Sequence, residues 1–321
     1  MPTAPTIPVI LDVDTGVDDA LAILFAVAHP GIDVLGISCV AGNASLENVV
    51  QNTLRVLDVA GAPDIPVAAG ARRPLLEPAR SASHVHGEGG LGTLQLPPSD
   101  RTAVPGSSIE LMRSLIAASP RPVTLVALAP QTNLALLLRQ YPDLAENIER
   151  IVFMGGSATV GNATAVAEFN VWHDPEAAAI VLDSGIPTFM YGLDVFNQVG
   201  IAEATASALL GGDSVLGQTV GALLTNRIML GADRASEYSG LIGDAGAVCA
   251  LVDPGALSTE RRPVSVQLAG YGRGQTLVDL RLHPGEDIVH GLHEEWATVE
   301  VALDVDAPRY ERLFLATLGL G

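Results

Sequence analysis

The sequence contains no lysine, although it has 321 residues, and all 17 of its basic side chains are arginines. This absence excludes phosphate binding through a P-loop lysine, Schiff-base catalysis and pyridoxal phosphate attached to lysine. Arginine is itself outnumbered, because 36 acidic residues leave a net charge of −19. Such a charge repels phosphate groups, so we expect neither a nucleic-acid partner nor an anionic membrane partner.

Cysteines and long apolar runs are also scarce. The two cysteines, Cys39 and Cys249, lie far apart in apolar surroundings, which is typical of buried thiols in a reducing compartment. The first apolar run, residues 7–11, ends at Asp12 and is too short to cross a membrane. No basic segment of a signal peptide precedes it. We therefore predict a cytoplasmic protein.

Apolar residues are abundant, at 48% of the chain, and their pattern predicts an α/β fold. Short runs rich in β-branched residues alternate with longer helical patterns, which is typical of a mostly parallel sheet covered by helices on both faces. The predicted strands are residues 9–13, 33–40, 66–69, 123–127, 151–154, 187–191, 275–279 and 298–304. The predicted helices are 18–28, 45–60, one that begins at Asp174, others within 204–243, and 307–318. We find no repeat or linker, so we expect one domain, residues 1–321.

Four carboxylates crowd the junction of the first strand and first helix: Asp12, Asp14, Asp18 and Asp19. Asp18 and Asp19 could simply complement the helix dipole, but that explanation does not cover acids at the end of an apolar strand. A hard divalent cation explains all four, because it would remove their repulsion. Calcium and magnesium both prefer oxygen ligands, and calcium tolerates irregular geometry better.

Polar residues follow the other predicted parallel strands at the edge where ligands bind in open α/β sheets. The residues found there are Gly42 and Asn43, then His84, His86 and Glu88, then residues 128–130, and finally residues 154–156 with Asn162, Glu168 and Asn170. These amides and acids lack a basic anchor. Such a set suits sugar hydroxyls and a cation better than phosphate, so the sequence predicts a polyol ligand.

Several segments, in this order and spacing, give the chain a resemblance to a known family. They are residues 12–20 (DVDTGVDDA), 40–43 (VAGN), 84–88 (HVHGE), 129–133 (APQTN), 154–156 (MGG), 161–162 (GN), 166–170 (VAEFN) and 174–177 (DPEA). The chain resembles the nucleoside hydrolases of the inosine-uridine preferring type. The resemblance implies a Rossmann-like open sheet, bound Ca²⁺, a homodimer or homotetramer, and hydrolysis of the N-glycosidic bond of ribonucleosides to ribose and free base.

The resemblance also implies a role for individual residues. The metal ligands would be Asp14, Asp19, the carbonyl of Leu128, and Asp244. Asp14 would also act as general base on a metal-bound water. The substrate would be held by Asp18, Asn43 and Asn170 at the 2′- and 3′-hydroxyls, by Asn162 and Glu168 at the 5′-hydroxyl, and by Met154. Neighbouring carboxylates would stabilise the positive charge that develops on the ring.

The chain departs from the family pattern at Gly243, where many members carry a histidine that protonates the departing base. His86, Tyr238 or His84 could supply that proton instead, and the sequence leaves these options open. It also leaves the preferred base open. If the missing histidine limits the rate, a histidine introduced at position 243 is predicted to raise the hydrolysis of poorly departing purines.

Other functions remain as alternatives. The same scaffold could serve a pentosyl transferase or a calcium-dependent sugar-binding protein. Asp12 and Asp14 also resemble the paired acids of haloacid-dehalogenase-type phosphatases, although no basic residue stands in a matching context. Residues 87–92 match the dinucleotide pattern G-x-G-x-x-G literally, yet no clear strand precedes them.

Overall fold

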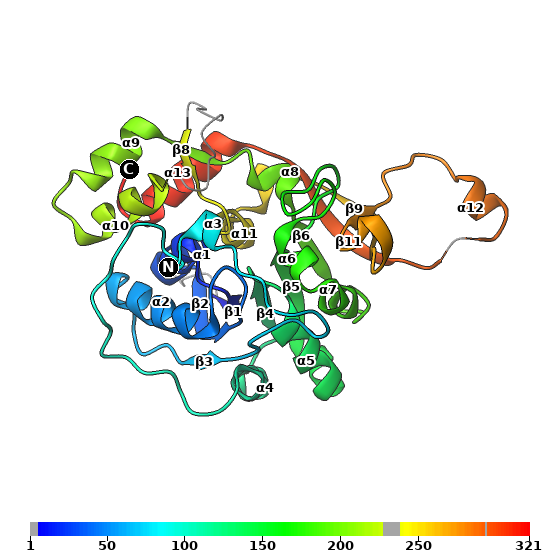
Figure 1. Cartoon of the computed structure of the whole chain (residues 1–321), viewed down its shortest axis with the longest axis horizontal. Coiled ribbons are helices and arrows are strands. Elements are labelled where there is room, and N and C mark those ends of the chain that lie inside the picture. Colours follow the sequence, from blue (N-terminus) through cyan, green and yellow to red (C-terminus); the bar gives the residue numbers. More distant parts are fainter. Residues whose placement is uncertain (1–5, 227–237, 293) are drawn as a thin grey trace, which may run out of the picture.

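A nine-stranded sheet runs through the computed structural model, which describes residues 6–226, 238–292 and 294–321 (Figure 1). The strand order is β10-β9-β11-β6-β5-β4-β1-β2-β3. The strands are β1 (Ile7–Val13), β2 (Ile32–Cys39), β3 (Val67–Ala69), β4 (Val123–Ala127), β5 (Ile148–Met154), β6 (Thr188–Tyr191), β9 (Leu257–Val266), β10 (Thr276–Val278) and β11 (Ala297–Val305). From β3 to β11 the neighbouring strands pair in parallel, which confirms the predicted fold class.

The order of the strands reverses between β1 and β4. β1 pairs in parallel with β2 on one side and with β4 on the other. Ligands of open α/β sheets bind beyond the carboxyl ends of the strands at such a reversal. Asp14 and Leu128, the residues that follow these two strands, therefore lie where a ligand is expected.

The last strands are the part of the sheet that the sequence pattern predicted least well. β9 was missed, although it pairs antiparallel with both β11 and β10. Most of its residues are at least partly exposed, and its sequence, LSTERRPVSV, has three consecutive charged residues, 260–262, at its centre. Such a strand lacks the continuous apolar run that identified the buried strands.

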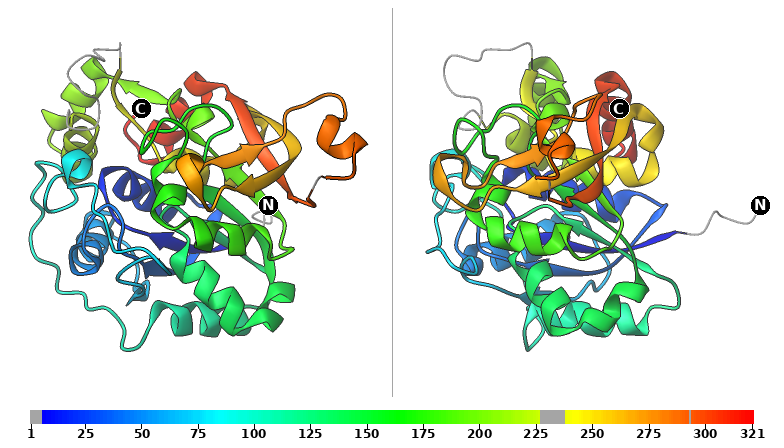
Figure 2. Two further views of the ribbon diagram at one scale, coloured as in Figure 1. Left: turned by 45° about the vertical axis from the view of Figure 1, so that its right-hand side comes forward. Right: turned by 90° about the vertical axis from the view of Figure 1, so that its right-hand side faces the viewer.

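Helices cover both faces of the sheet (Figure 2). They are α1 (Val17–Ala28), α2 (Leu46–Val59), α3 (Ser83–His86), α4 (Ser108–Ala118), α5 (Thr132–Gln140), α6 (Phe169–His173), α7 (Pro175–Leu182), α8 (Leu193–Phe196), α9 (Glu203–Leu210), α10 (Val215–Leu224), α11 (Ala245–Val252), α12 (Glu286–Val289) and α13 (Ala307–Thr317). Side chains of α1, α2, α11 and α13 form one apolar core, and those of α4, α5 and α7 form a second. Successive residues of β1 alternate between these two cores, as expected for a sheet buried on both faces.

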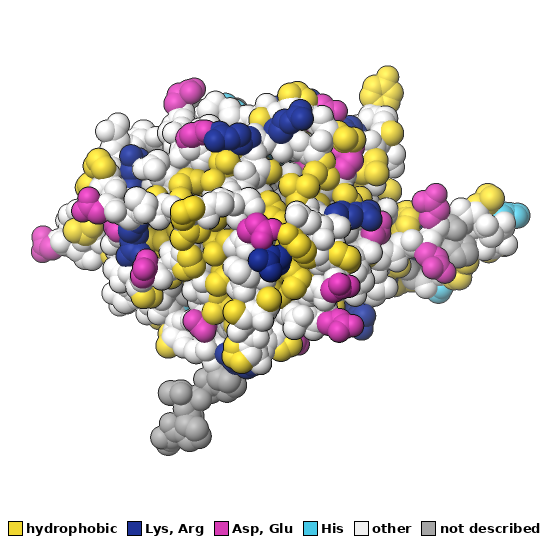
Figure 3. Space-filling model, turned by 90° about the horizontal axis from the view of Figure 1, so that it is seen from below, with side chains coloured by type: hydrophobic (Ala, Val, Ile, Leu, Met, Phe, Trp, Pro, Cys, Tyr) yellow, Lys and Arg dark blue, Asp and Glu magenta, His cyan; other side chains and the backbone are white. Residues whose placement is uncertain are grey.

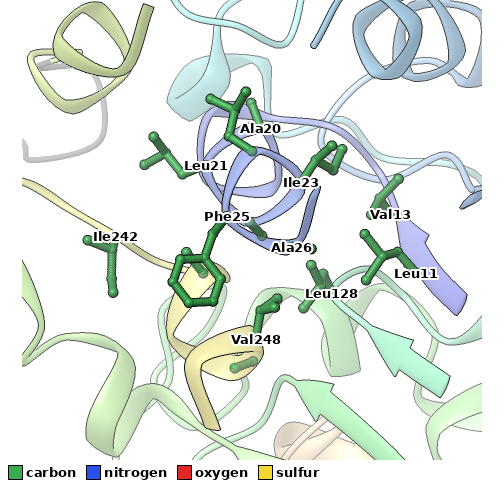
Figure 4. Close-up of a cluster of buried hydrophobic side chains, with 14 of the residues drawn as sticks. Leu11, Val13, Ala20, Leu21, Ile23, Phe25, Ala26, Leu128, Ile242 and Val248 are labelled. Carbon is green, nitrogen blue, oxygen red and sulfur yellow. The ribbon is translucent and has the colours of Figure 1, made fainter. Parts of the chain in front are cut away.

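Helix α1 is enclosed along most of its length, because residues 17–26 are all buried. Figure 4 shows its side chains among Leu11 and Val13 of β1, Leu128, Ile242 and Val248. The carboxylates at the start of this helix therefore stand on a closely packed base.

Two regions lie outside the main sheet. β7 (Gly200–Ala202) and β8 (Tyr238–Leu241) form a small antiparallel sheet that the sequence did not predict. An arm, residues 279–292, carries α12 and projects from the body (Figures 1 and 3). In the described residues no helix is long and apolar enough to span a membrane. Cys39 and Cys249 are both buried and unpaired.

Candidate active site

Asp19 organises the turn between β1 and α1. Its carboxylate accepts the N–H of Asp14 at 3.1 Å and the N–H of Gly16 at 2.9 Å. An acid in the first turn commonly satisfies free backbone N–H groups in this way. Asp19 therefore has the structural role that the helix dipole predicts, but that role does not account for its acidic neighbours.

Asn43, which follows β2, binds the same turn from the other side. Its backbone N–H donates to Asp14 at 2.6 Å, and its side-chain amide donates to Asp14 and to Asp19, each at 3.1 Å. These bonds fix the direction of both carboxylates. All three side chains are at least nine-tenths buried.

Asp244, immediately before α11, brings a further carboxylate to this place. One carboxylate oxygen from each of Asp18, Asp19 and Asp244 lies within 4.8 Å of the others. We call Asp14, Asp18, Asp19 and Asp244 the acidic corner. Burial, followed by repulsion between these groups, raises the pKa of Asp14 and Asp244 well above the usual range and that of Asp19 to about 7.

The acidic corner fits a hard divalent cation. In the described part of the chain no arginine pairs with it, and its one ion-pair contact is His86, 3.9 Å from Asp18. The Oδ1 atom of Asp18 is buried and has no hydrogen-bond partner among the described residues. Buried carboxylates without a counter-charge are unfavourable, and oxygen donors are the ligands that calcium and magnesium prefer.

Helix α6 supplies the opposite wall. Glu168 caps this helix by accepting the N–H groups of Asn170 at 2.8 Å and Val171 at 3.1 Å, and burial raises its pKa to about 7. The amide group of Asn170 donates to the carbonyls of Leu128 at 3.0 Å and Met154 at 3.1 Å. With both amide hydrogens used, the Asn170 oxygen remains as an acceptor for a ligand.

His86 closes the site from the loop after β3. Its Nδ1 accepts the backbone N–H of Val17 at 3.2 Å. This bond requires an unprotonated Nδ1, so a neutral ring carries its proton on Nε2. Burial lowers the pKa of His86, which favours that neutral form.

Comparisons with known proteins agree with this geometry. The family model of the inosine-uridine preferring nucleoside hydrolases matches residues 9–312. This chain belongs to that family. The pyrimidine-specific ribonucleoside hydrolases RihA of Salmonella enteritidis and Citrobacter koseri are 40% and 42% identical to it over 275 and 276 residues, 85% of this chain and 88% of theirs.

Solved structures give the same result over the whole length. A purine-preferring ribonucleoside hydrolase from Gardnerella vaginalis aligns with a TM-score of 0.85 at 30% identity, covering 98% of both chains. The plant nucleoside hydrolase PpNRh1 aligns with a TM-score of 0.87 at 31% identity, covering 98% of this chain and 99% of its own. As a nucleoside hydrolase, the chain is an enzyme that cleaves N-glycosidic bonds.

The structure of this nucleoside hydrolase brings most of the candidate residues into one connected group. Direct contacts or mutual electrostatic effects join Asp14, Asp18, Asp19, Asn43, His86, Leu128, Met154, Glu168, Asn170 and Asp244. Asn162 is exposed in the neighbouring loop, where its oxygen accepts the N–H of Phe169 at 2.9 Å. The side chain of Tyr238, the first residue of β8, lies outside the described residues.

Asp12 differs from the other acids at this junction. Its carboxylate accepts the Ser38 hydroxyl at 2.5 Å and the amide of Asn133, at the start of α5, at 2.9 Å. It therefore ties β1 to β2 and α5, so the idea that one cation explains all four acids is too broad. The family match over residues 9–312 argues against the phosphatase alternative. Asn133 lies in a motif of the family, but its spacing gave no indication of this role.

Gly243 has a steric reason to be glycine. Its φ is +56°, and a Cβ atom built there would lie 2.4 Å from the Cβ of Asp18. Any side chain at this position would strain the backbone and displace Asp18. The structure therefore argues against the prediction that a histidine at position 243 improves catalysis.

Proposed function

We propose that this enzyme hydrolyses ribonucleosides in a calcium-dependent reaction in which Asp14 is the general base. The observation that carries the proposal is the acidic corner, where buried carboxylates meet at the strand reversal and no arginine of the described residues pairs with them. A divalent cation would provide the missing positive charge. The irregular arrangement of the donors favours calcium over magnesium.

The cation would be held by Asp14, Asp19, Asp244 and the carbonyl of Leu128. When bound, it would orient the sugar diol and lower the pKa of a water molecule. Asp14 would take the proton from the water that attacks the anomeric carbon. Its fixed direction, set by Asn43 at 2.6 Å, supports this role because a general base must be placed before it is needed.

The remaining wall would bind the ribose. Asp18, Asn43 and Asn170 would contact the 2′- and 3′-hydroxyls, and Asn162 with Glu168 would contact the 5′-hydroxyl, with Met154 beside the ring. The carboxylates around the sugar would stabilise the positive charge that develops as the glycosidic bond breaks.

His86 is the residue that we propose protonates the departing base. Its Nδ1 accepts from Val17, so the Nε2–H remains to donate. This assignment also explains how the enzyme could work with glycine at position 243. Tyr238 stays an alternative donor.

We propose pyrimidine ribonucleosides as the preferred substrates. The curated relatives named pyrimidine-specific are 40–42% identical to this chain, whereas the solved purine-preferring relative is 30% identical. We also propose that the enzyme is cytoplasmic, forms one domain over residues 1–321, and assembles as a homodimer or homotetramer.

The test is to remove metal ions with a chelator, restore calcium or magnesium separately, and measure release of reducing sugar from uridine, cytidine, inosine and 4-nitrophenyl riboside. We expect calcium to restore activity best, with uridine and cytidine ahead of inosine. Full activity after exhaustive chelation would contradict the metal dependence. Hydrolysis of 4-nitrophenyl phosphate without hydrolysis of ribosides would favour a phosphatase.

A further inference from the structure

The glycine-rich loop, residues 87–92, lies directly after His86 and has a role that its sequence pattern did not reveal. It begins at the end of α3 and folds back on itself, because Gly92 donates its N–H to the carbonyl of His86 at 2.7 Å and Gly90 donates to Gly87 at 3.1 Å. These short turns join the loop and His86 into one small unit. A displacement of the loop would therefore be transmitted to the histidine.

Asn52, on α2, fastens this loop to the turn between β1 and α1. Its side-chain amide donates one hydrogen bond to the carbonyl of Gly89 at 2.8 Å and another to the carbonyl of Thr15 at 3.2 Å. The side chain is only 3% exposed. One buried amide group thus connects the loop that carries His86 with the residue directly after Asp14.

Glycine at position 90 makes this approach feasible. Its φ is +90°, and a Cβ atom built there would lie 2.9 Å from the Asn52 amide nitrogen and 3.4 Å from the Thr15 carbonyl. A side chain would separate the loop from α2. The glycines that produce the literal match to a dinucleotide motif therefore serve another purpose here: they let the loop backbone pack closely against Asn52.

The two groups that Asn52 holds depend on it to different degrees. Thr15 has a separate anchor, because its hydroxyl contacts the hydroxyl of Thr53 at 2.6 Å, and Asp19 holds both neighbouring N–H groups. The carbonyl of Gly89 has Asn52 as its hydrogen-bond donor in the described part of the chain. Loss of the Asn52 amide should therefore loosen the loop at Gly89, while Leu91 in the main core still holds its end and the turn stays in place.

We propose that Asn52 is a positioning residue for base departure, because its amide, together with the bond from the Val17 N–H to the ring, keeps His86 against the turn that carries Asp14 and Asp18. This inference rests on the function proposed above, in which His86 protonates the leaving base. It predicts a defect that depends on the leaving group. Substrates whose base needs a proton should suffer, whereas 4-nitrophenyl riboside, whose leaving group departs as an anion, should not.

The chain offers a matched control one turn earlier on α2. The Asn48 amide donates to the carbonyl of Glu88 at 3.2 Å, at an exposed position, and does not reach Thr15. Asn48→Ala removes an amide from the same helix and the same loop, so it should change kcat/KM by no more than about twofold. Alanine suits a helix, and thermal unfolding checks that both variants fold.

The experiment measures kcat/KM for uridine and 4-nitrophenyl riboside in Asn52→Ala, Asn48→Ala, His86→Ala and the double variant Asn52→Ala/His86→Ala. We expect Asn52→Ala to lower the value for uridine about 100-fold and that for the aryl riboside by less than about threefold. The double variant should be little worse than His86→Ala, because both changes remove the same function. Hydrogen exchange of residues 87–92 should accelerate in Asn52→Ala but not in Asn48→Ala.

Failure of the inference and failure of the proposed function give different results. Equal losses on both substrates in Asn52→Ala, multiplicative losses in the double variant, or unchanged exchange in the loop would overturn the role of Asn52. Equal losses on both substrates in His86→Ala would instead overturn the proposed role of His86.

Discussion

The acidic corner and the glycine-rich loop are neighbours at the site but are fastened in different ways. The corner stands on α1, which is buried along most of its length, and its carboxylates accept hydrogen bonds from backbone and from Asn43. In the loop, only Leu91 reaches the main apolar core, and the stretch before it is joined to the body through side chains such as Asn52. The residues proposed to bind the sugar and cation are thus held by more contacts than the loop proposed to meet the base.

Removing the general base gives the largest expected effect. Asp14→Ala should lower kcat by about 10⁴-fold, because it removes the proposed base and one cation ligand together. The loss should be similar for uridine and 4-nitrophenyl riboside, since the corner acts on the water and the sugar. Calcium-induced thermal stabilisation should also weaken. Near-normal turnover in this variant would remove Asp14 from the mechanism.

A side chain at Gly243 tests whether the corner is as rigid as its packing indicates. Gly243→His should lower kcat/KM about 100-fold on every substrate, because the new Cβ atom would displace Asp18. Gly243→Ala isolates the steric part and should cause most of the same loss. An increase in inosine hydrolysis by Gly243→His would show that the corner adapts and that the missing proton donor limits the rate.

The same contrast explains what could be predicted from the sequence. The acids of the corner follow a buried strand at a fixed spacing, so Asp14, Asp18 and Asp19 were found without a structure. Ser45 and Asp174 were likewise expected at the ends of helices, and both accept the capping bond, Ser45 from Asn48 at 3.3 Å and Asp174 from Ala177 at 3.1 Å. Such features can be predicted from the sequence because the groups that interact are only a few residues apart.

The remaining features depend on contacts between distant residues. Asn52 lies 37 residues from both Thr15 and Gly89, and Asp12 meets Asn133 across 121 residues. An isolated asparagine in a helix gives no local signal of such a partner. β9 was missed for a related reason, because its pairing with β11 stabilises a strand whose own residues are mostly polar and partly exposed.

The 5′-hydroxyl site should show a smaller effect. The Asn162 oxygen accepts the N–H of Phe169, which leaves its amide group to donate to the substrate. Asn162→Ala should lower kcat/KM for uridine about 10-fold, as expected for one hydrogen bond. The variant should leave 5′-deoxyuridine nearly unaffected, because that substrate lacks the hydroxyl. Equal losses on the two substrates would indicate a role in loop structure alone.

The smallest effect concerns stability and pH. Burial raises the pKa of Asp12, Asp19 and Glu168 to about 7, so above pH 7 these acids are charged and destabilise the metal-free fold. Between pH 7 and 4 the folded state binds protons that the unfolded chain does not, so stability rises as pH falls. We expect the melting temperature of metal-free protein to rise by a few degrees from pH 8 to 6.5, by calorimetry.

Two buried histidines limit the pH range over which stability rises as pH falls. Burial lowers the pKa of His86, and it lowers that of His173 to about 4. Below about pH 6.5 these two histidines are therefore protonated in the unfolded chain but stay neutral in the folded protein, which lowers the stability of the fold. Bound calcium should reduce the rise in melting temperature between pH 8 and 6.5, because it would keep Asp19 charged. A melting temperature that falls steadily from pH 8 to 6.5 without metal would contradict these pKa directions.

The buried thiols make spectroscopic labelling of the loop straightforward. Burial raises the pKa of Cys39 to about 12 and that of Cys249 well above its usual range, so neither forms the thiolate that labelling reagents attack. A cysteine introduced in place of Glu88, which is exposed, would be the reactive thiol of the described chain. A spin label or fluorophore attached there would report whether the loop moves during turnover, without background from the native cysteines.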